Sequence, residues 1–399
     1  MSAAARDAAD PLAPFAARFH KPPGTLYLDG NSLGLACHAA DAALLAAVAD
    51  WKAFAVRGWT AGDHPWFGLS REVAARLAPL LGADAADVML GQSTTANLHQ
   101  LLATFADPAG GVLLDATAFP SDRYAVRSFL RAEPHLVRPG PDRLLDIRPS
   151  DFAGVRFAVL PAVVYTTGQL LDLPALTAAA REHGVTVAWD CSHSAGVVPH
   201  QFRDHDIDLA FGCTYKHLNG GPGSVGWLYV HPRLRDQPPG LAGWFGADPA
   251  RQFDMADTLA PAADAHRYLI GTPHVFSLAP LLGSLAVVAE AGIGRIRAKS
   301  LAQTAYLRER LERLGFAVVT PRADADRGGH LTLSHPHAGR LSAALRARGV
   351  VPDYRPPDLL RLAPAPLYTS FAECDRAADE LAAVVADLDR LPENADAVT

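Results

Sequence analysis

Short apolar runs alternate with amphipathic stretches along the first two thirds of the chain. Short apolar runs predict strands, and the longer segments with apolar residues at every third or fourth position predict helices. The expected strands cover residues 88–90, 111–114, 157–160, 185–189, 207–211 and 225–230. The expected helices cover residues 38–56, 69–80, 97–105, 123–131 and 173–183. Strands and helices that alternate at this spacing indicate an α/β protein whose largely parallel sheet is covered on both faces.

The pattern changes after about residue 272. A long stretch rich in Ala, Leu and Arg predicts one helical segment over residues 277–314. Mixed strands and helices follow it, with breaks at 328–329 and 356–357. We therefore expect two domains, a large one formed by residues 38–272 and a smaller α+β domain formed by residues 1–37 with 273–399.

Composition and charge narrow the class of protein. Hydrophobic residues make up 49% and charged residues 20% of the 399 residues, as in ordinary globular proteins. The net charge of −6 gives no electrostatic reason to expect a nucleic-acid partner. The four cysteines form no CxxC pair, which fits a reducing compartment, and the sixteen histidines form no HExxH or Cys/His pattern, so we expect no metal. Without a signal peptide or an apolar run of membrane-spanning length, we expect a cytoplasmic protein and no membrane partner.

Two motifs put chemically useful side chains directly after predicted strands. The segment AWDCSHSAG places Asp190 at a strand end, where α/β folds bind ligands, and His193 three residues later. The segment GCTYKHLNGGPG places Lys216 before a glycine-rich turn, where the backbone can approach a bulky cofactor. A carboxylate can keep a pyridine nitrogen protonated, and a lysine amine can form a Schiff base with an aldehyde. The plainer interpretations are a turn-capping aspartate and a solvated lysine, although the chain has only four lysines.

Three further motifs fit an anionic, aromatic ligand. In the segment 91–97, GQSTTAN, hydroxyls and N–H groups at a helix N-terminus could bind a phosphate, or a hydroxyl could simply cap the helix. In FPSD, the ring of Phe119 could stack on an aromatic group and Asp122 could accept a hydrogen bond; the alternative is a core phenylalanine and a helix cap. Arg361, in a proline-bounded strand, could grip a carboxylate with two hydrogen bonds or could be a surface arginine.

The order of these motifs resembles that of fold-type I enzymes that use pyridoxal 5′-phosphate (PLP), the aminotransferase-like superfamily that includes aminotransferase class V. The amino-acid sequences of the individual segments resemble, more specifically, those of the kynureninase family in its bacterial form. The matching segments are DGNSLGL, FPSD, TTGQ, DCSHSAG, GCTYKHLNGGPG, GWFG, GTP and RLAPAPLY. They run from Asp29 to Tyr368, so the resemblance covers nearly the whole chain. It implies the aminotransferase-like fold and a homodimer with active sites at the interface.

The resemblance implies a role for each matching residue. Lys216 would carry PLP as a Schiff base and later act as a general base, Tyr215 would touch the phosphate and assist proton transfer, and Asp190 would face the pyridine nitrogen. The other implied cofactor contacts are Thr94 and Thr95 at the phosphate, Phe119 on the ring, Asp122, His193, and Trp244 and Thr272 across the dimer interface. The implied substrate contacts are Arg361 at the α-carboxylate and Ser32 and Trp59 near the aromatic ring.

The implied activity is hydrolysis of the Cβ–Cγ bond of L-kynurenine to anthranilate and L-alanine, in tryptophan catabolism or NAD-related metabolism. Trp59 and Thr272 match the bacterial form, which favours L-kynurenine over the 3-hydroxylated substrate. Two positions depart from the family pattern. Pro161 stands where a hydroxyl residue is frequent, and Thr369 replaces an asparagine that often follows the PLY segment.

Three alternatives remain at the level of the sequence. One is a kynureninase-like enzyme that acts on a different aryl-keto amino acid in secondary metabolism. Another is a cysteine desulfurase-type lyase, although the loop at 322–330 lacks the cysteine that such chemistry needs. The third is a PLP-binding protein without catalysis, although no basic helix-turn-helix segment precedes Asp29.

Overall fold

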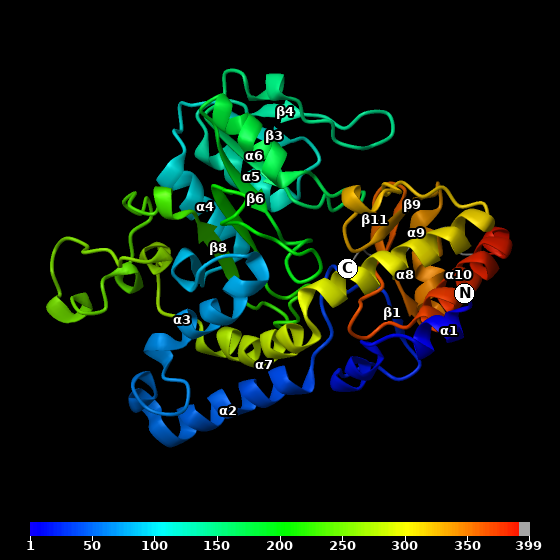
Figure 1. The fold of residues 1–399 in the computed structure, drawn as a ribbon, viewed down its shortest axis with the longest axis horizontal. Helices are drawn as coiled ribbons and strands as arrows, with labels where there is room; N and C mark the ends of the chain where they lie inside the picture. The colour runs from blue at the N-terminus through cyan, green and yellow to red at the C-terminus, as the bar shows by residue number, and fades with distance from the viewer. Residues whose placement is uncertain (391–399) are drawn as a thin grey trace.

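A seven-stranded mixed sheet lies at the centre of the larger part of the molecule (Figure 1). The computed structural model describes residues 1–390, so residues 391–399 of the predicted small domain lie outside the described residues. The strand order is β2-β8-β7-β6-β5-β3-β4, and β8 runs in the direction opposite to the other six strands. The strands are β2 (Val88–Leu90), β3 (Val112–Asp115), β4 (His135–Val137), β5 (Phe157–Pro161), β6 (Thr186–Asp190), β7 (Leu209–Cys213) and β8 (Gly226–Val230).

All six strands expected from the sequence are confirmed at closely similar bounds, and β4 is the one that was missed. β4 is a three-residue edge strand in which only Val137 is buried. A strand this short, with one buried side chain, produces no apolar run or alternation that could be recognised.

Helices cover both faces of this sheet, as the pattern predicted. On one face α4 (Thr94–Phe105) and α5 (Pro120–Phe129) pack in a core with alternate sheet residues such as Ala188 and Phe211. On the other face α3 (Trp66–Leu77), α6 (Leu173–Glu182) and α7 (Val275–Ala291) pack in a second core with Trp189 and Ala210. The long helix α2 (His38–Phe54) lies against α7 (Figure 1). The expected helices in this part of the chain are therefore confirmed.

The remaining elements form a smaller α+β part with its own hydrophobic core. Its antiparallel sheet has the order β11-β12-β9. The strands are β9 (Leu331–Ser334), β11 (Asp353–Arg355) and β12 (Leu359–Leu362), and the helices are α1 (Ala3–Ala8), α8 (Ile293–Arg313), α9 (Ala338–Ala347) and α10 (Phe371–Ala386). The N-terminal strand β1 (Leu26–Tyr27) pairs in parallel with β10 (Val350–Val351). The division into domains 38–272 and 1–37 with 273–399 stays a prediction.

The single helical stretch predicted for residues 277–314 is wrong. Two helices, α7 and α8, meet at Gly292, which has a φ of 78°, and their axes are bent by 75°. Apolar residues continue on both sides of the break, so the pattern alone does not reveal it. Within the described part of the chain no single helix is long and apolar enough to cross a membrane; α7 and α8 meet that criterion only as a bent pair.

Candidate active site

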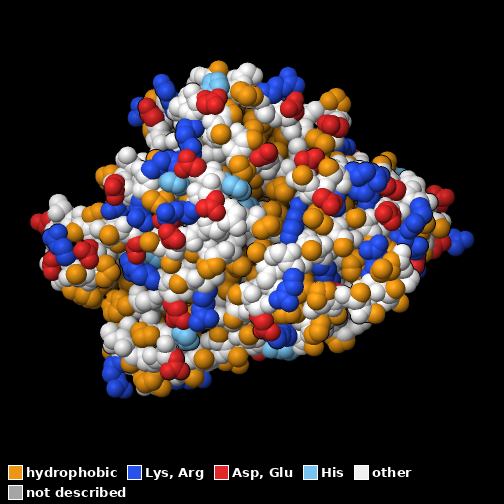
Figure 2. Space-filling view, viewed as in Figure 1, with side chains coloured by type: hydrophobic (Ala, Val, Ile, Leu, Met, Phe, Trp, Pro, Cys, Tyr) orange, Lys and Arg blue, Asp and Glu red, His pale blue; other side chains and the backbone are white. Residues whose placement is uncertain are grey.

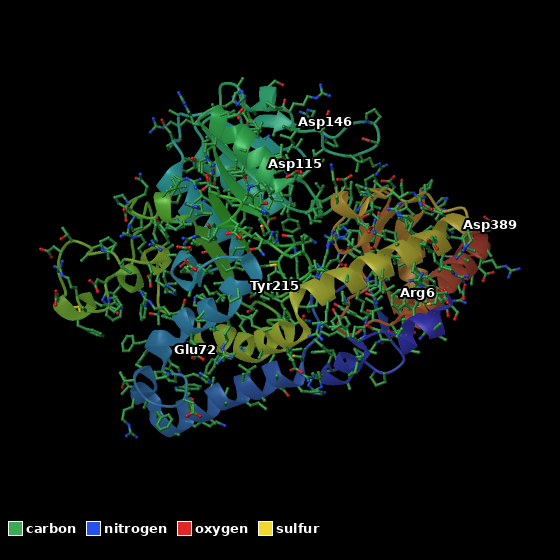
Figure 3. The ribbon with its side chains drawn as sticks, viewed as in Figure 1. Arg6, Glu72, Asp115, Asp146, Tyr215 and Asp389 are labelled. Atoms are coloured by element: carbon green, nitrogen blue, oxygen red, sulfur yellow. The ribbon has the colours of Figure 1, made fainter. Side chains whose placement is uncertain are left out.

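A cavity of about 590 Å³ lies where the carboxyl ends of the parallel strands face β12 and the segment after β1. This is the end of a parallel sheet at which α/β proteins bind ligands, and the volume lies within the roughly 300–1,000 Å³ usual for small-molecule sites. Ten of the thirteen predicted site residues line it: Ser32, Thr94, Thr95, Phe119, Asp122, Asp190, His193, Tyr215, Lys216 and Arg361. Figure 3 shows Tyr215 near the middle of the molecule.

Lys216 follows β7, and its amine lies inside this cavity. Its Nζ is 2.9 Å from Nε2 of His193 and 6.0 Å from the centre of the Phe119 ring. Burial, and then the neighbouring Lys216, lower the pKa of His193 well below 6.5, so the imidazole is neutral at pH 7 and can accept a hydrogen bond from the amine. The DGNSLGL segment packs directly on the backbone of the lysine, because Gly34 donates to the carbonyl oxygen of Tyr215 and a Cβ at Gly34 would collide with that of Lys216.

Two carboxyl groups meet at the wall of the cavity. Asp190 ends β6 and accepts a hydrogen bond from the N–H of Ser192 at 2.9 Å, and Asp122 lies in the first turn of α5. Burial, and then the nearby charge of Asp190, raise the pKa of Asp122 well above 3.8. Two carboxyl groups side by side, of which Asp122 is buried, need a proton or a cation between them, and a protonated pyridine nitrogen supplies both. This pair therefore fits the expected cofactor.

The N-terminus of α4 forms another end of the cavity. The Ser93 hydroxyl accepts a hydrogen bond from the N–H of Ala96 at 3.1 Å and caps the helix. Thr94 and Thr95 instead line the cavity beside the first N–H groups of the helix. Hydroxyls and N–H groups at the positive end of a helix dipole suit a phosphate. The residue that caps the helix, Ser93, is therefore not one of the two predicted to bind the phosphate.

Arg361 on β12 closes the cavity at the small-domain side. Only 1% of its side chain is exposed, its Nη1 donates to the carbonyl oxygen of Tyr165 at 2.7 Å, and it forms an ion pair with Asp353. Burial lowers its pKa from 12.5 to about 10, so it keeps its charge at neutral pH. Ser32 lies at this end of the cavity, with its Oγ 3.4 Å from Nη2 of Arg361.

Sequence reasoning missed other side chains that line the cavity or support it. Tyr165 lines it and lies edge-on to Phe119, with ring centres 5.6 Å apart. Asp353 and Arg355 lie two residues apart on β11, next to the strand of Arg361. Their alternation in a strand adjoining a predicted binding arginine was an available signal, because residues two apart face the same side. Tyr165 gave no comparable signal.

Three predicted residues do not line this cavity within the described chain. Trp59 and Thr272 line a separate hollow of about 380 Å³, where the Trp59 ring lies 5.0 Å from that of Phe67. Trp244 donates from Nε1 to the carbonyl oxygen of Gln252 at 2.9 Å. Within the described chain these three residues therefore lie apart from the cavity that holds the other predicted site residues. Among residues 1–390, no group of three or more His, Cys, Asp or Glu side chains is placed to hold a metal ion.

Comparison with known proteins adds independent findings. The family model of the kynureninase C-terminal domain matches residues 296–381. The chain is 46% identical to a kynureninase of Geobacillus thermodenitrificans (strain NG80-2) over 384 residues, which cover 92% of this chain and 90% of that protein. It is 45% identical to a kynureninase of Shouchella clausii (strain KSM-K16), with the same coverage of both chains.

Solved structures show the same fold at low sequence identity. A cysteine desulfurase from Thermococcus onnurineus NA1, solved without ligand, superposes with a TM-score of 0.78 at 18% identity and covers 91% of this chain and 95% of its own. A variant of C-DES with glycine covalently linked to its PLP cofactor gives the same TM-score and identity, over 90% of this chain and 97% of its own. The fold is that of fold-type I PLP enzymes, as predicted.

Proposed function

The chain belongs to the kynureninase family, and on that premise we propose which of its residues carry out the reaction. It is a PLP-dependent hydrolase that cleaves the Cβ–Cγ bond of L-kynurenine to give anthranilate and L-alanine. The observation that carries the assignment to this cavity is the amine of Lys216, held beside His193 and facing the paired acids Asp190 and Asp122.

The cofactor would be held at three points of the cavity. Lys216 would bind its aldehyde carbon covalently, Asp190 with Asp122 would face the pyridine nitrogen, and Thr94 and Thr95 would take the phosphate. PLP, once bound, supplies a cationic ring that takes up electrons from the substrate Cα. Tyr215 would also reach the phosphate, Phe119 would stack on the ring, and His193 would line the ring on its pyridine side.

Lys216 and Tyr215 would move the protons. After the substrate amine displaces it, the Lys216 amine would act as the base that removes the α-proton, with the neutral His193 as its hydrogen-bond partner. Burial raises the pKa of Tyr215 above 10, so its phenol keeps its proton at neutral pH and can serve as an acid in the protonation steps. Arg361 would fix the α-carboxylate and so orient the bond that breaks.

A homodimer would complete the site. Large apolar side chains are exposed on α2 and at the start of α7, among them Trp51 at 57% and Phe276 at 42%. They adjoin the hollow lined by Trp59 and Thr272. An apolar surface of this kind is typical of a subunit interface. Packed against a second copy, it would bring Trp59, Thr272 and Trp244 toward the partner's cavity.

The finer substrate and pathway assignments are also part of the proposal. Trp59 and Thr272 support L-kynurenine over its 3-hydroxylated form, and the enzyme would act in the cytoplasm, in tryptophan catabolism or NAD-related metabolism.

The desulfurase alternative is not favoured: the solved desulfurases share 18% identity and show the fold alone, and all four cysteines of this chain are buried. Burial raises the pKa of these four thiols, so their ionisation to the nucleophilic thiolate is disfavoured.

The test is a turnover assay with product identification. The purified chain is loaded with PLP, given L-kynurenine or 3-hydroxykynurenine, and the products are identified by mass and fluorescence. Release of anthranilate and L-alanine, with the higher kcat/KM for L-kynurenine, is the expected result. A higher kcat/KM for the 3-hydroxylated substrate would refute the argument from Trp59 and Thr272. If the enzyme turned over another aryl-keto amino acid and not L-kynurenine, the assignment of L-kynurenine as its substrate would be refuted.

A further inference from the structure

A second guanidinium lines the cavity, and the proposed function does not use it. Arg355 on β11 has 20% of its side chain exposed and borders the cavity together with Arg361. β11 and β12 are antiparallel, and their register puts Asp353 directly opposite Arg361. Because residues two apart on a strand share a face, Arg355 and Asp353 point to the same side of the sheet as Arg361. The two arginines therefore flank one corner of the cavity.

Asp353 connects these two arginines. It is fully buried, and its Oδ2 is 3.0 Å from Nη2 of Arg355, accepts a hydrogen bond from the Ser32 hydroxyl at 2.9 Å, and is the partner of Arg361 in an ion pair. The Ser32 hydroxyl oxygen lies 3.4 Å from Nη2 of Arg361 and 3.5 Å from Nη2 of Arg355. One carboxylate oxygen thus draws both guanidinium groups and the hydroxyl to a single point.

The hydrogen-bond donors at this corner leave room for another anion. Two guanidinium groups face the single carboxylate of Asp353, and Asp29 is the other acid close to them. Burial raises the pKa of Asp29 above 3.8, while the Ser32 hydroxyl and the nearby arginines act in the opposite direction. The Nε atoms of Arg355 and Arg361 are buried and have no hydrogen-bond partner among the described residues. A buried cation with donors to spare is stabilised by a carboxylate that accepts from it.

We propose that Arg355 binds the substrate α-carboxylate together with Arg361, and that Asp353 is the positioning residue that holds both guanidinium groups at the cavity wall. A carboxylate has two oxygens, and two arginines that approach from different strands can each donate to one or both of them. The inference rests on the proposed function, because the amino-acid substrate comes from it.

The first test measures whether Arg355 recognises a carboxylate. The full-length enzyme, loaded with PLP, is titrated with L-alanine or with L-alaninamide, which lacks the carboxylate, and binding is followed by the absorbance of the cofactor. In Arg355→Gln the dissociation constant for L-alanine should rise about tenfold and that for L-alaninamide should change less than about twofold, as expected for one lost charged hydrogen bond. Equal changes for both ligands, or none for either, would overturn the proposal.

Steady-state kinetics give a second readout of the same variant. KM for L-kynurenine should rise about tenfold in Arg355→Gln while kcat stays within about threefold, because binding rather than chemistry is weakened. The matched control is Arg143→Gln, which removes another arginine paired with an aspartate, Asp358, but one that does not line the cavity. It should leave both ligand affinities and KM unchanged.

Asp353→Asn tests the positioning role. Like Arg355→Gln, it should weaken the binding of L-alanine more than that of L-alaninamide, because the two guanidinium groups lose their common acceptor. If this variant binds no PLP, Arg355→Gln alone decides the proposal. A wild-type enzyme that prefers L-alanine to L-alaninamide but releases no anthranilate from L-kynurenine would refute the proposed substrate and leave the two-arginine site intact.

Discussion

At the scale of single residues, charge in the cavity is controlled mainly by burial. His193 is neutral because burial makes its charged form costly, and Tyr215 keeps its proton for the same reason. Asp122 is pushed toward its uncharged form by burial and by Asp190. The cofactor ring is the group that can relieve this last conflict, since it brings positive charge between the two acids.

The Asp122–Asp190 pair makes the stability of the cofactor-free protein depend on pH. Since the pKa of Asp122 is higher in the folded protein than in the unfolded chain, the folded protein holds a proton that the unfolded chain has already lost. The stabilisation from this proton is present at low pH and is lost as the pH rises through the folded-state pKa.

Asp122→Asn should therefore stabilise the cofactor-free protein increasingly as the pH rises. The midpoint of thermal unfolding, measured without PLP at several pH values between about 4 and 8, should exceed that of the wild type most at the highest pH. An advantage that is equal at all pH values, or that shrinks as the pH rises, would contradict the raised pKa of Asp122.

Some residues of the site could be predicted from the sequence, and others could not. Lys216, Asp190 and Arg361 could be predicted as site residues because each lies in a sequence motif and either ends, follows or lies in a recognisable strand. The alternation of Asp353 and Arg355 on one strand was an available signal, but their contact with Arg361 arises from the pairing of two strands and cannot be read from either segment alone. The ten residues that share the cavity could be assembled from motif order, but the hydrogen bonds between them could not.

At the scale of elements, the break between α7 and α8 is the clearest departure from the sequence-based expectation. Gly292 joins them with a positive φ of 78°, a conformation that residues with a Cβ adopt at a cost. The break allows α7 to pack in the large core with α2 and α3 and α8 to pack in the small core. Such a bend is set by tertiary packing on both sides, so periodicity could not reveal it.

Gly292→Ala should destabilise the folded protein by about 1–3 kcal/mol, the usual cost when a residue with a Cβ is held in a sparsely populated backbone conformation such as φ 78°, ψ 124°. A Cβ there would meet no atom closer than 3.5 Å, so backbone strain accounts for the whole effect. Denaturant unfolding measures the change, and Gly294→Ala, inside α8 with open space around its Cβ, is the control. If Gly294→Ala destabilised the protein as much as Gly292→Ala, or more, the positive φ at Gly292 would not be what requires a glycine at the bend.

At the scale of the whole molecule, acidic and basic side chains are interspersed over the face drawn in Figure 2. The same face shows no extended area of basic side chains, in keeping with the net charge of −6.

The strand and helix pattern was sufficient to predict the mixed α/β architecture, because alternating elements permit few arrangements. The sequence could not show where Trp59, Thr272 and Trp244 act, since within one chain they lie away from the main cavity.

The proposed dimer predicts that one charge on α2 separates the subunits. Trp51→Asp places a carboxylate in the exposed apolar surface of α2 and should shift the protein from dimer to monomer in analytical ultracentrifugation, with a loss of kynurenine turnover. Leu314→Asp, at an exposed leucine that follows α8, should change neither property. A fully active monomer, or a dimer unaffected by Trp51→Asp, would contradict the proposed interface.

The covalent link between Lys216 and PLP is the claim on which the functional assignment depends. Borohydride reduction of the PLP-loaded enzyme, followed by digestion and mass spectrometry, locates that link directly. We expect reduced pyridoxyl phosphate on the peptide that contains Lys216 and none after Lys216→Ala. Label on a peptide containing Lys21, Lys52 or Lys299, or a Lys216→Ala variant that is still labelled, would contradict it.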